Sequence, residues 1–361
     1  MRSALALLVA AAAAAAPAPA RAHIVYARST LAQFAEQAEL AVVAEFRSGP
    51  KLWAAADGSD REEYYEIRVV ETLKGSAGAE RIEFFPHAEG FPSYAAGERA
   101  LVFLDRTEGH AEFAGAALRF AWFSTQGPGQ EWRLAGAEAA PVLAAARGWA
   151  GVAKSPGAVA PAGRRELLAA VLGSGIPRLE SDALVELVRT GGALLADADG
   201  VAPFAALASS RSLRAPVRLP LVRLLDGRGG FEAAPVLLAM TREPLTPAEL
   251  ALLVQVAGGL RDARFSLWLA GVAKGDDAAL RLAAVRALGQ PWHAPAVPTL
   301  APLAVADDPT LARAALQSLA AIGTPEARTA LETAAASSTD PQRKSWAEAA
   351  LRRLDLGAPA P

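Results

Sequence analysis

The chain of 361 residues contains no cysteine. This absence excludes disulfide bonds, thiol catalysis and cysteine-ligated zinc, and it excludes a lipid anchor of the bacterial kind, which is attached to a cysteine. Histidine is scarce, and no metalloprotease motif, P-loop, dinucleotide-binding loop or nucleophile elbow is present. We therefore expect no catalytic residues and no bound cofactor.

Long apolar runs are missing except at the start. Residues 5–16 are entirely apolar, follow a basic start, and end before the small residues Ala20 and Ala22. Such a pattern is typical of a secretory signal, and the run is shorter than the roughly 20 residues that a bilayer span needs. We predict that residues 1–22 are removed near Ala22/His23, although a cut after Ala20 stays open. The protein would then be exported, soluble in the periplasm or outside the cell, and not inserted in the membrane.

Aromatic residues become scarce after the first third of the chain. All four tyrosines and nine of the twelve phenylalanines precede residue 125, whereas the later sequence is rich in Ala, Leu and Val. Aromatic and β-branched residues favour strands, while Ala and Leu favour helices. We predict the following parts: a signal at 1–22, a β domain at 23–134, a Gly/Pro/Ala-rich linker at 135–163, an α-solenoid at 164–355 and a tail at 356–361.

Neither half has a large excess of positive charge. Residues 23–140 contain 11 Lys and Arg against 18 Asp and Glu, a net −7, and residues 141–361 contain 23 against 20, a net +3. Non-specific nucleic-acid binding needs a clustered excess of basic residues. We therefore expect no nucleic-acid partner, and the composition does not indicate an oligomeric state.

The N-terminal part has the pattern of a small β domain. Ser29-Thr30 can cap a helix that ends near Glu39. Alternating or continuous apolar residues predict strands at 40–46, 62–73, 82–84 and 100–104, and a closing hairpin of 118–123 with 131–134 around a turn at 127–129. Five or six short antiparallel strands with one helix fit a small closed barrel of the OB type.

Three segments of this domain carry a family resemblance. The order of the helix, AELAVVAEF, YYEIRVVETLKG and YAAGERALVFLD resembles the OB-fold domains related to the netrin module and the tissue inhibitors of metalloproteinases. In those inhibitors the mature N-terminal residue chelates the zinc of the target protease. The resemblance places His23 at that position, and it implies an inhibitor-like or metal-chelating role for the β domain.

The C-terminal half contains a repeat. Asp277, Asp308 and Asp340 each precede an apolar helical pattern, at intervals of 31 and 32 residues, and the last two are followed by proline. Asp at the N-cap and Pro in the first turn are typical helix starts. Upstream helices that extend the array are predicted near 164–173, 179–190, 201–208, 213–225, 231–241, 247–259 and 262–273. Single helix pairs cannot bury their apolar faces alone, so they must stack.

This repeat resembles the HEAT repeats, including the short form seen in phycobilisome-lyase-type proteins. The residues that carry the resemblance are Asp277, Ala284, Val285, Ala287, Leu288, Asp308, Ala315, Leu316, Leu319 and Gly323. The family holds protein partners on a concave surface, so the resemblance implies that another protein binds here.

The four histidines include the candidate metal ligands. A free amine and imidazole at His23 could chelate copper or zinc, with a further ligand from His87 or His110. His293, beside Trp292, has the position of a packing residue. The other interpretation is that the first three are simple surface residues.

Other chemistry-bearing groups favour structural roles. The acidic run at 60–63 lacks EF-hand spacing, and Ser93 lacks the glycine that a nucleophile elbow requires. Trp53, Trp122 and Trp132 fit either a ligand-stacking face of the barrel or its core.

The sequence therefore favours an exported, non-enzymatic interaction protein that uses a HEAT-like solenoid surface. Two alternatives stay open: an inhibitor-like or metal-chelating β domain that acts through the mature N-terminus, and a hydrolase or lyase with a site between the domains.

Overall fold

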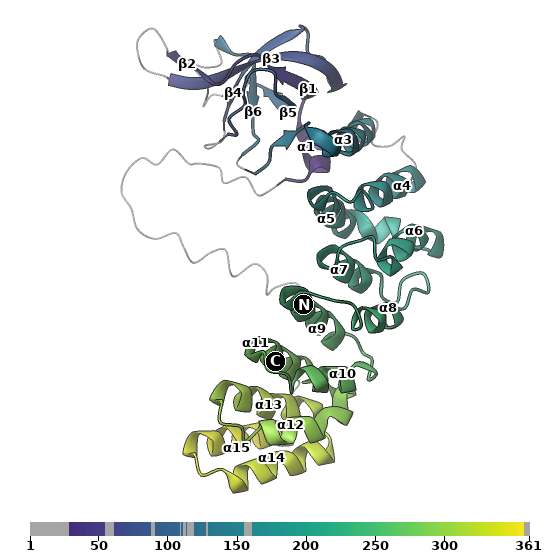
Figure 1. Cartoon of the computed structure of the whole chain (residues 1–361), viewed down its shortest axis with the longest axis vertical. Helices are drawn as coiled ribbons and strands as arrows, with labels where there is room; N and C mark the ends of the chain where they lie inside the picture. The colour runs from purple at the N-terminus through teal and green to yellow at the C-terminus, as the bar shows by residue number, and fades with distance from the viewer. Residues whose placement is uncertain are drawn as a thin grey trace. The chain divides into compact units, whose positions relative to one another are not determined.

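The computed structural model describes residues 29–54, 61–87, 91–108, 110, 113, 119–127, 129–154 and 161–356. The predicted signal lies outside the described residues. The chain divides into two compact units, Met1–Ser155 and Pro156–Pro361 (Figure 1), which we call the β unit and the helical unit. None of the helices in the described part has the length and apolar character needed to span a bilayer.

The β unit consists of short strands flanked by helices. Its described elements are α1 (Leu31–Gln37), β1 (Leu40–Phe46), β2 (Lys51–Ala54), β3 (Arg61–Lys74), β4 (Arg81–Pro86), β5 (Arg99–Arg106), β6 (Trp122–Ser124), β7 (Trp132–Arg133), the 3₁₀ turn η2 (Gly136–Glu138) and α3 (Ala139–Lys154).

Five of these strands close into a barrel. β1 pairs antiparallel with β3 and with β5, β3 pairs with β4, and β6 joins β4 to β5. The predicted fold class, a small barrel with a helix followed by a helical solenoid, is confirmed. The expected hairpin of 118–123 with 131–134 is wrong, because β6 runs parallel to β4 and β7 pairs with β5. Strand β2, which pairs antiparallel with the first residues of β3, was not predicted.

The barrel interior explains why β1 lacks the alternation of a half-buried strand. β1 has a hydrogen-bonded neighbour on each side, and six of its seven residues are buried. Phe46 stacks on Tyr94 at 4.0 Å between ring centroids and meets Tyr65 edge-on at 5.7 Å. A second aromatic cluster forms beside this core from Phe85, Phe113, Phe120 and Phe123.

Two helices complete the β unit. Thr30 and Gln33 form a capping box at the start of α1, as the Ser29-Thr30 pattern predicts. Residues 139–154 of the segment predicted as a linker form α3, which packs against α1 and β3. Arg147 of α3 donates two hydrogen bonds, 2.9 and 2.8 Å long, to the carboxylate of Glu71 on β3.

The helical unit is a series of helix hairpins. Its elements are α4 (Pro161–Leu172), α5 (Pro177–Leu194), α6 (Ala198–Ser209), α7 (Ala215–Leu225), α8 (Ala233–Met240), α9 (Pro247–Gly258), α10 (Phe265–Val272), α11 (Ala278–Ala287), the 3₁₀ segment η3 (Pro291–Ala296), α12 (Val297–Leu303), α13 (Pro309–Ile322), α14 (Pro325–Ser337) and α15 (Pro341–Asp355). Each helix predicted from the apolar periodicity is present.

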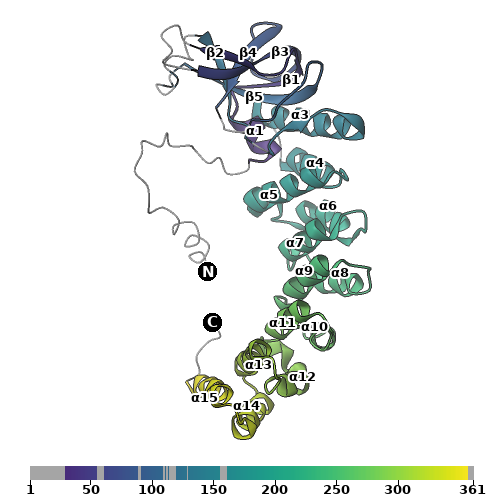
Figure 2. The ribbon, with the colours of Figure 1, turned by 60° about the vertical axis from the view of Figure 1, so that its left-hand side comes forward.

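The hairpins stack so that the second helix of each pair contacts the second helix of the next. Helices α5, α7, α9, α11, α13 and α15 form this inner row, which lies on the inner side of the curve of the helical unit in both views (Figures 1 and 2). Asp277, Asp308 and Asp340 accept hydrogen bonds from the first-turn amides of α11, α13 and α15. The predicted N-caps are therefore confirmed, and these caps fix where the second helix of each of these hairpins begins.

Candidate functional site

The structure brings two of the predicted metal ligands to one place. His87 and His110 both contact Phe113, at 4.8 and 5.4 Å between ring centroids, and both contact Phe123. His23 lies outside the described residues. Among those that are described, no three histidine or carboxylate side chains converge as a metal site would require.

The tryptophans of the β unit belong to its packing. Trp122 and Trp132 are buried, and Trp53 is half-buried against Phe120 at 5.7 Å between centroids. The guanidinium of Arg106 covers the Trp122 ring at 4.0 Å. These rings fill or cover the barrel core, which was the second of the two predicted roles.

The structure also places Ser93 and part of the acidic run at 60–63. Ser93 lies in a loop, where its carbonyl oxygen accepts a 2.7 Å hydrogen bond from Arg133. Of the acidic run at 60–63, Glu62 and Glu63 lie on β3, where they pair with the edge strand β2. Asp60 lies outside the described residues.

His293 is buried in the helical unit, as its predicted packing role requires. Its Nδ1 lies 2.9 Å from the Oγ of Ser266, and both side chains are fully buried. Burial lowers the pKa of the imidazole, opposed by the Gly258 carbonyl and the charge of Asp262. A serine beside a histidine suggests nucleophilic chemistry, but a substrate cannot reach a pair that has no exposed surface.

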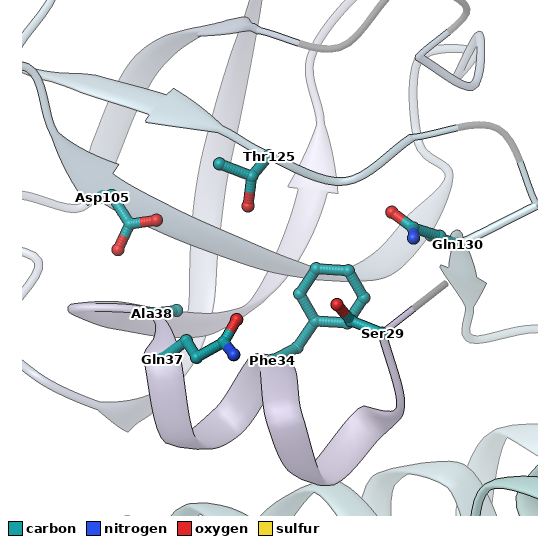
Figure 3. Close-up of a pocket in the computed structure, with 7 residues that line it drawn as sticks. All are labelled: Ser29, Phe34, Gln37, Ala38, Asp105, Thr125 and Gln130. Carbon is teal, nitrogen blue, oxygen red and sulfur yellow. The ribbon is translucent and has the colours of Figure 1, made fainter. Parts of the chain in front are cut away.

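A small cavity lies beside α1 in the β unit. It measures about 120 Å³, and Figure 3 shows its lining side chains. They are Ser29, Phe34, Gln37, Ala38, Asp105, Thr125 and Gln130. Burial raises the pKa of Asp105, whose Oδ1 accepts a 3.0 Å hydrogen bond from the Glu39 amide. Sites for drug-sized ligands have volumes of about 300–1,000 Å³, so this cavity suits a few water molecules or one small polar group.

The inner row of the helical unit exposes a repeated set of polar side chains. Arg223 on α7, Gln255 on α9, Arg286 on α11 and Gln317 on α13 are all exposed, and they follow one another at intervals of 32, 31 and 31 residues. Each stands nine residues after the N-cap of its helix. The four side chains therefore occupy equivalent positions on consecutive helices. We call them the Arg/Gln row.

The sequence contains the repeat spacing of this row, but the apolar periodicity does not reveal it. The apolar repeat predicts which helix face is buried, whereas the row lies on the opposite face. Aligning the helices on Asp277 and Asp308 would have placed Arg286 and Gln317 in register. Only the stacking of the hairpins shows that this face is the inner one.

The first inner helix differs from those that follow. On α5 the carboxylates of Glu180 and Glu186 are buried, and each pairs with an arginine, Arg214 at 2.9 Å and Arg189 at 2.8 Å. The carboxylates of Glu180 and Glu186 are therefore already paired with cations.

Stacked helix hairpins with a continuous inner row define the second unit as an α-solenoid. The sequence profile of the HEAT repeats matches residues 266–352, from α10 to α15. The C-terminal hairpins are therefore HEAT-like repeats, and the pairing of α4 to α9 continues the same architecture upstream. No curated protein matches the chain.

Proposed function

We propose that this is an exported, non-enzymatic interaction protein whose helical unit binds a partner protein along its inner row. The observation that carries this proposal is the Arg/Gln row: four exposed side chains at equivalent positions of four consecutive helices. HEAT-like repeats commonly mediate protein–protein contacts, which agrees with a binding role for this surface.

The sizes of the inner helical face and of the cavity in the β unit favour a protein as the ligand over a small molecule. A stable protein interface buries about 800 Å² on each partner. Six inner helices spaced about 8–10 Å apart provide a face of that size. The cavity of about 120 Å³ in the β unit is too small for an ordinary ligand site.

Site-specific photo-crosslinking tests the proposal. In one protein, a photoreactive phenylalanine analogue replaces Gln255 on the inner row. In the control, it replaces Ala239, an exposed residue on α8, which is the first helix of its hairpin and lies outside the inner row. The full-length protein is expressed in its natural host and irradiated. We expect a discrete crosslinked protein with the analogue at position 255 and none at 239. Equal crosslinking at both positions would reject a binding role for the inner row.

Export forms a separate part of the proposal. It is supported by the basic and apolar start of the sequence and by its small-residue exit at Ala20 and Ala22. N-terminal sequencing of the protein from the periplasm or the culture medium tests it, and a first residue of His23 is expected. An intact Met1 in protein from the cytoplasm would contradict export.

A second candidate function concerns metal chelation by the β unit. The contacts of His87 and His110 with the same phenylalanine support it, because they bring two imidazoles to one patch. The closed five-stranded barrel also agrees with the OB-type, inhibitor-like resemblance. Titration of the mature protein with Cu²⁺, compared with a His23→Ala variant, tests this function. Equal Cu²⁺ binding by the two proteins would show that His23 is not a ligand of the metal.

A further inference from the structure

We propose that the Arg/Gln row binds an extended, acidic segment of a partner protein, laid across the inner helices. This inference rests on the proposed function and adds the chemistry of the partner. It is carried by the spacing, the charge and the donor groups of the four side chains.

The spacing of the row matches an extended polypeptide. Packed helices lie about 8–10 Å apart, and an extended chain rises about 3.3 Å for each residue. One inner helix therefore corresponds to about three residues of the bound segment, and the four helices from α7 to α13 correspond to about ten. An extended segment of that length can meet Arg223, Gln255, Arg286 and Gln317 in turn.

Taken together, the four helices of the row carry positive charge, of which only that of the buried Arg218 is compensated within the described residues, by Glu243. Helices α7, α11 and α13 contain arginine and no acidic residue, and the single carboxylate of α9, Glu249, belongs to the capping box at its start. In the parts of the helical unit that are described, no ion pair involves Arg223, Arg286 or Arg313.

The N-cap carboxylates are too distant to neutralise the row. Asp277 lies nine residues before Arg286, which is about 13 Å along a helix that rises 1.5 Å per residue. The Debye length at physiological ionic strength is about 8 Å, so exposed charges at this separation are largely screened from each other. The guanidinium groups therefore remain available to carboxylates from outside.

The donor groups discriminate between kinds of polyanion. A guanidinium binds a carboxylate through two parallel hydrogen bonds, and a carboxamide can both donate to and accept from a peptide group. Alternating Arg and Gln therefore suits a peptide that presents both carboxylates and backbone amides. Nucleic acid binds through many phosphate contacts, and residues 141–361 carry a net charge of only +3.

The experiment uses the full mature chain and a synthetic probe. The probe is a fluorescein-labelled peptide of about twelve residues with glutamate at every third position and glycine and serine between, in agreement with the rise of about 3.3 Å per residue. Fluorescence anisotropy at low salt measures its dissociation constant. A peptide with lysine in place of glutamate and an oligothymidine of similar length are measured in parallel.

Charge reversal on the row provides the decisive variant. We expect R223E/R286E to weaken binding of the glutamate peptide at least tenfold. The control, R242E/K274E, makes the same change in charge at exposed residues of the α8–α9 and α10–α11 connections, and it should change binding less than twofold. Thermal unfolding followed by circular dichroism confirms that both variants are folded.

Any of three other outcomes would overturn the inference. These outcomes are equal losses in the two variants, no preference for glutamate over lysine, or oligothymidine binding that is as tight and depends on the same arginines. Self-association that R223E/R286E abolishes, seen by sedimentation, would assign the row to a second copy of the chain. If crosslinking at position 255 still captures a partner in R223E/R286E, the proposed function stands and the acidic-segment inference fails.

Discussion

Ser266 and His293 meet inside the helical unit, with the Ser266 Oγ 2.9 Å from the His293 Nδ1 and neither side chain exposed. Ser266 belongs to α10 and His293 to η3, so the contact joins the first helix of one repeat to the beginning of the next. Because His293 is titratable and lies at this junction, we expect the stability of the helical unit to depend on pH.

Burial lowers the pKa of His293 in the folded protein, whereas the unfolded chain has the ordinary histidine pKa of about 6.5. As the pH falls through that value, the unfolded chain binds a proton that the folded protein does not, so the free energy of unfolding decreases. This contribution is fully present above the unfolded pKa and decreases by at most about 1.4 kcal/mol per pH unit below it.

We expect the wild-type free energy of unfolding to fall more steeply between about pH 7.5 and 5.5 than that of a His293→Gln variant. Urea denaturation at several pH values measures both slopes, and the comparison of slopes removes any constant cost of the substitution. Parallel curves would show that His293 does not titrate differently in the two states.

Arg218 provides a second prediction, because its side chain is only 3% exposed and its guanidinium pairs with the carboxylate of Glu243. It also donates a 3.1 Å hydrogen bond to the Ser210 carbonyl. Replacing Glu243 by alanine leaves a buried cation without its counter-charge, and we expect a destabilisation of about 3 kcal/mol.

The control removes an exposed ion pair from the same unit. Asp355 pairs with Arg328, and their side chains are 58% and 43% exposed. Asp355→Ala should therefore cost less than about 1 kcal/mol in chemical denaturation. Equal costs for the two variants would mean that the Arg218–Glu243 pair is open to solvent in solution.

Comparing alanine substitutions at two glycines of the β unit distinguishes the cost of backbone strain from the cost of a steric clash. Gly75 has φ +76°, and a Cβ there would lie 2.2 Å from the Glu39 carbonyl oxygen. Gly78 has φ +69°, with no atom within 4 Å of the Cβ position. We expect Gly78→Ala to cost about 1 kcal/mol for the left-handed conformation, and Gly75→Ala about 3 kcal/mol or more.

Hydrogen exchange measured on peptides from β1 reports these costs for the β unit alone. A faster exchange in Gly75→Ala than in Gly78→Ala is expected, because Glu39 directly precedes β1. Similar exchange in both variants would contradict the close approach of the Gly75 turn to Glu39.

Local signals in the sequence predicted most of the elements correctly. Thr30 and Asp308 mark helix starts because a side chain caps the amides of the next turn, an interaction within four residues. Strand pairing depends on residues far apart in the chain. The parallel pairing of β4 with β6 and the addition of β2 were therefore missed.

The candidate site was less predictable for a related reason. His87 and His110 share Phe113 only because the barrel brings their loops together. Arg223 and Arg286 are ordinary exposed helix residues in the sequence, and they become neighbours in a row only when the hairpins stack. Periodicity identifies the buried face of each helix, but it does not show what the other face meets.

The last prediction concerns the close packing of α9 on α11, on which the geometry of the row depends. A Cβ on Gly258 would lie 2.5 Å from the Cβ of Ala287, so Gly258→Ala pushes the two helices apart. We expect a destabilisation of about 1–3 kcal/mol from overpacking. Gly271 in α10 has no atom within 4 Å of its Cβ position, so Gly271→Ala should stabilise the protein by about 0.5–1 kcal/mol.

The two substitutions are chemically identical, so opposite signs in chemical denaturation would show that contact between inner helices determines the difference. Because α9 carries Gln255 and α11 carries Arg286, a shift between these helices also changes the register of the Arg/Gln row. Gly258→Ala should therefore weaken binding of the glutamate peptide under conditions in which the variant is still folded, while Gly271→Ala leaves it unchanged. A stabilising effect of both substitutions would contradict the tight packing of neighbouring inner helices.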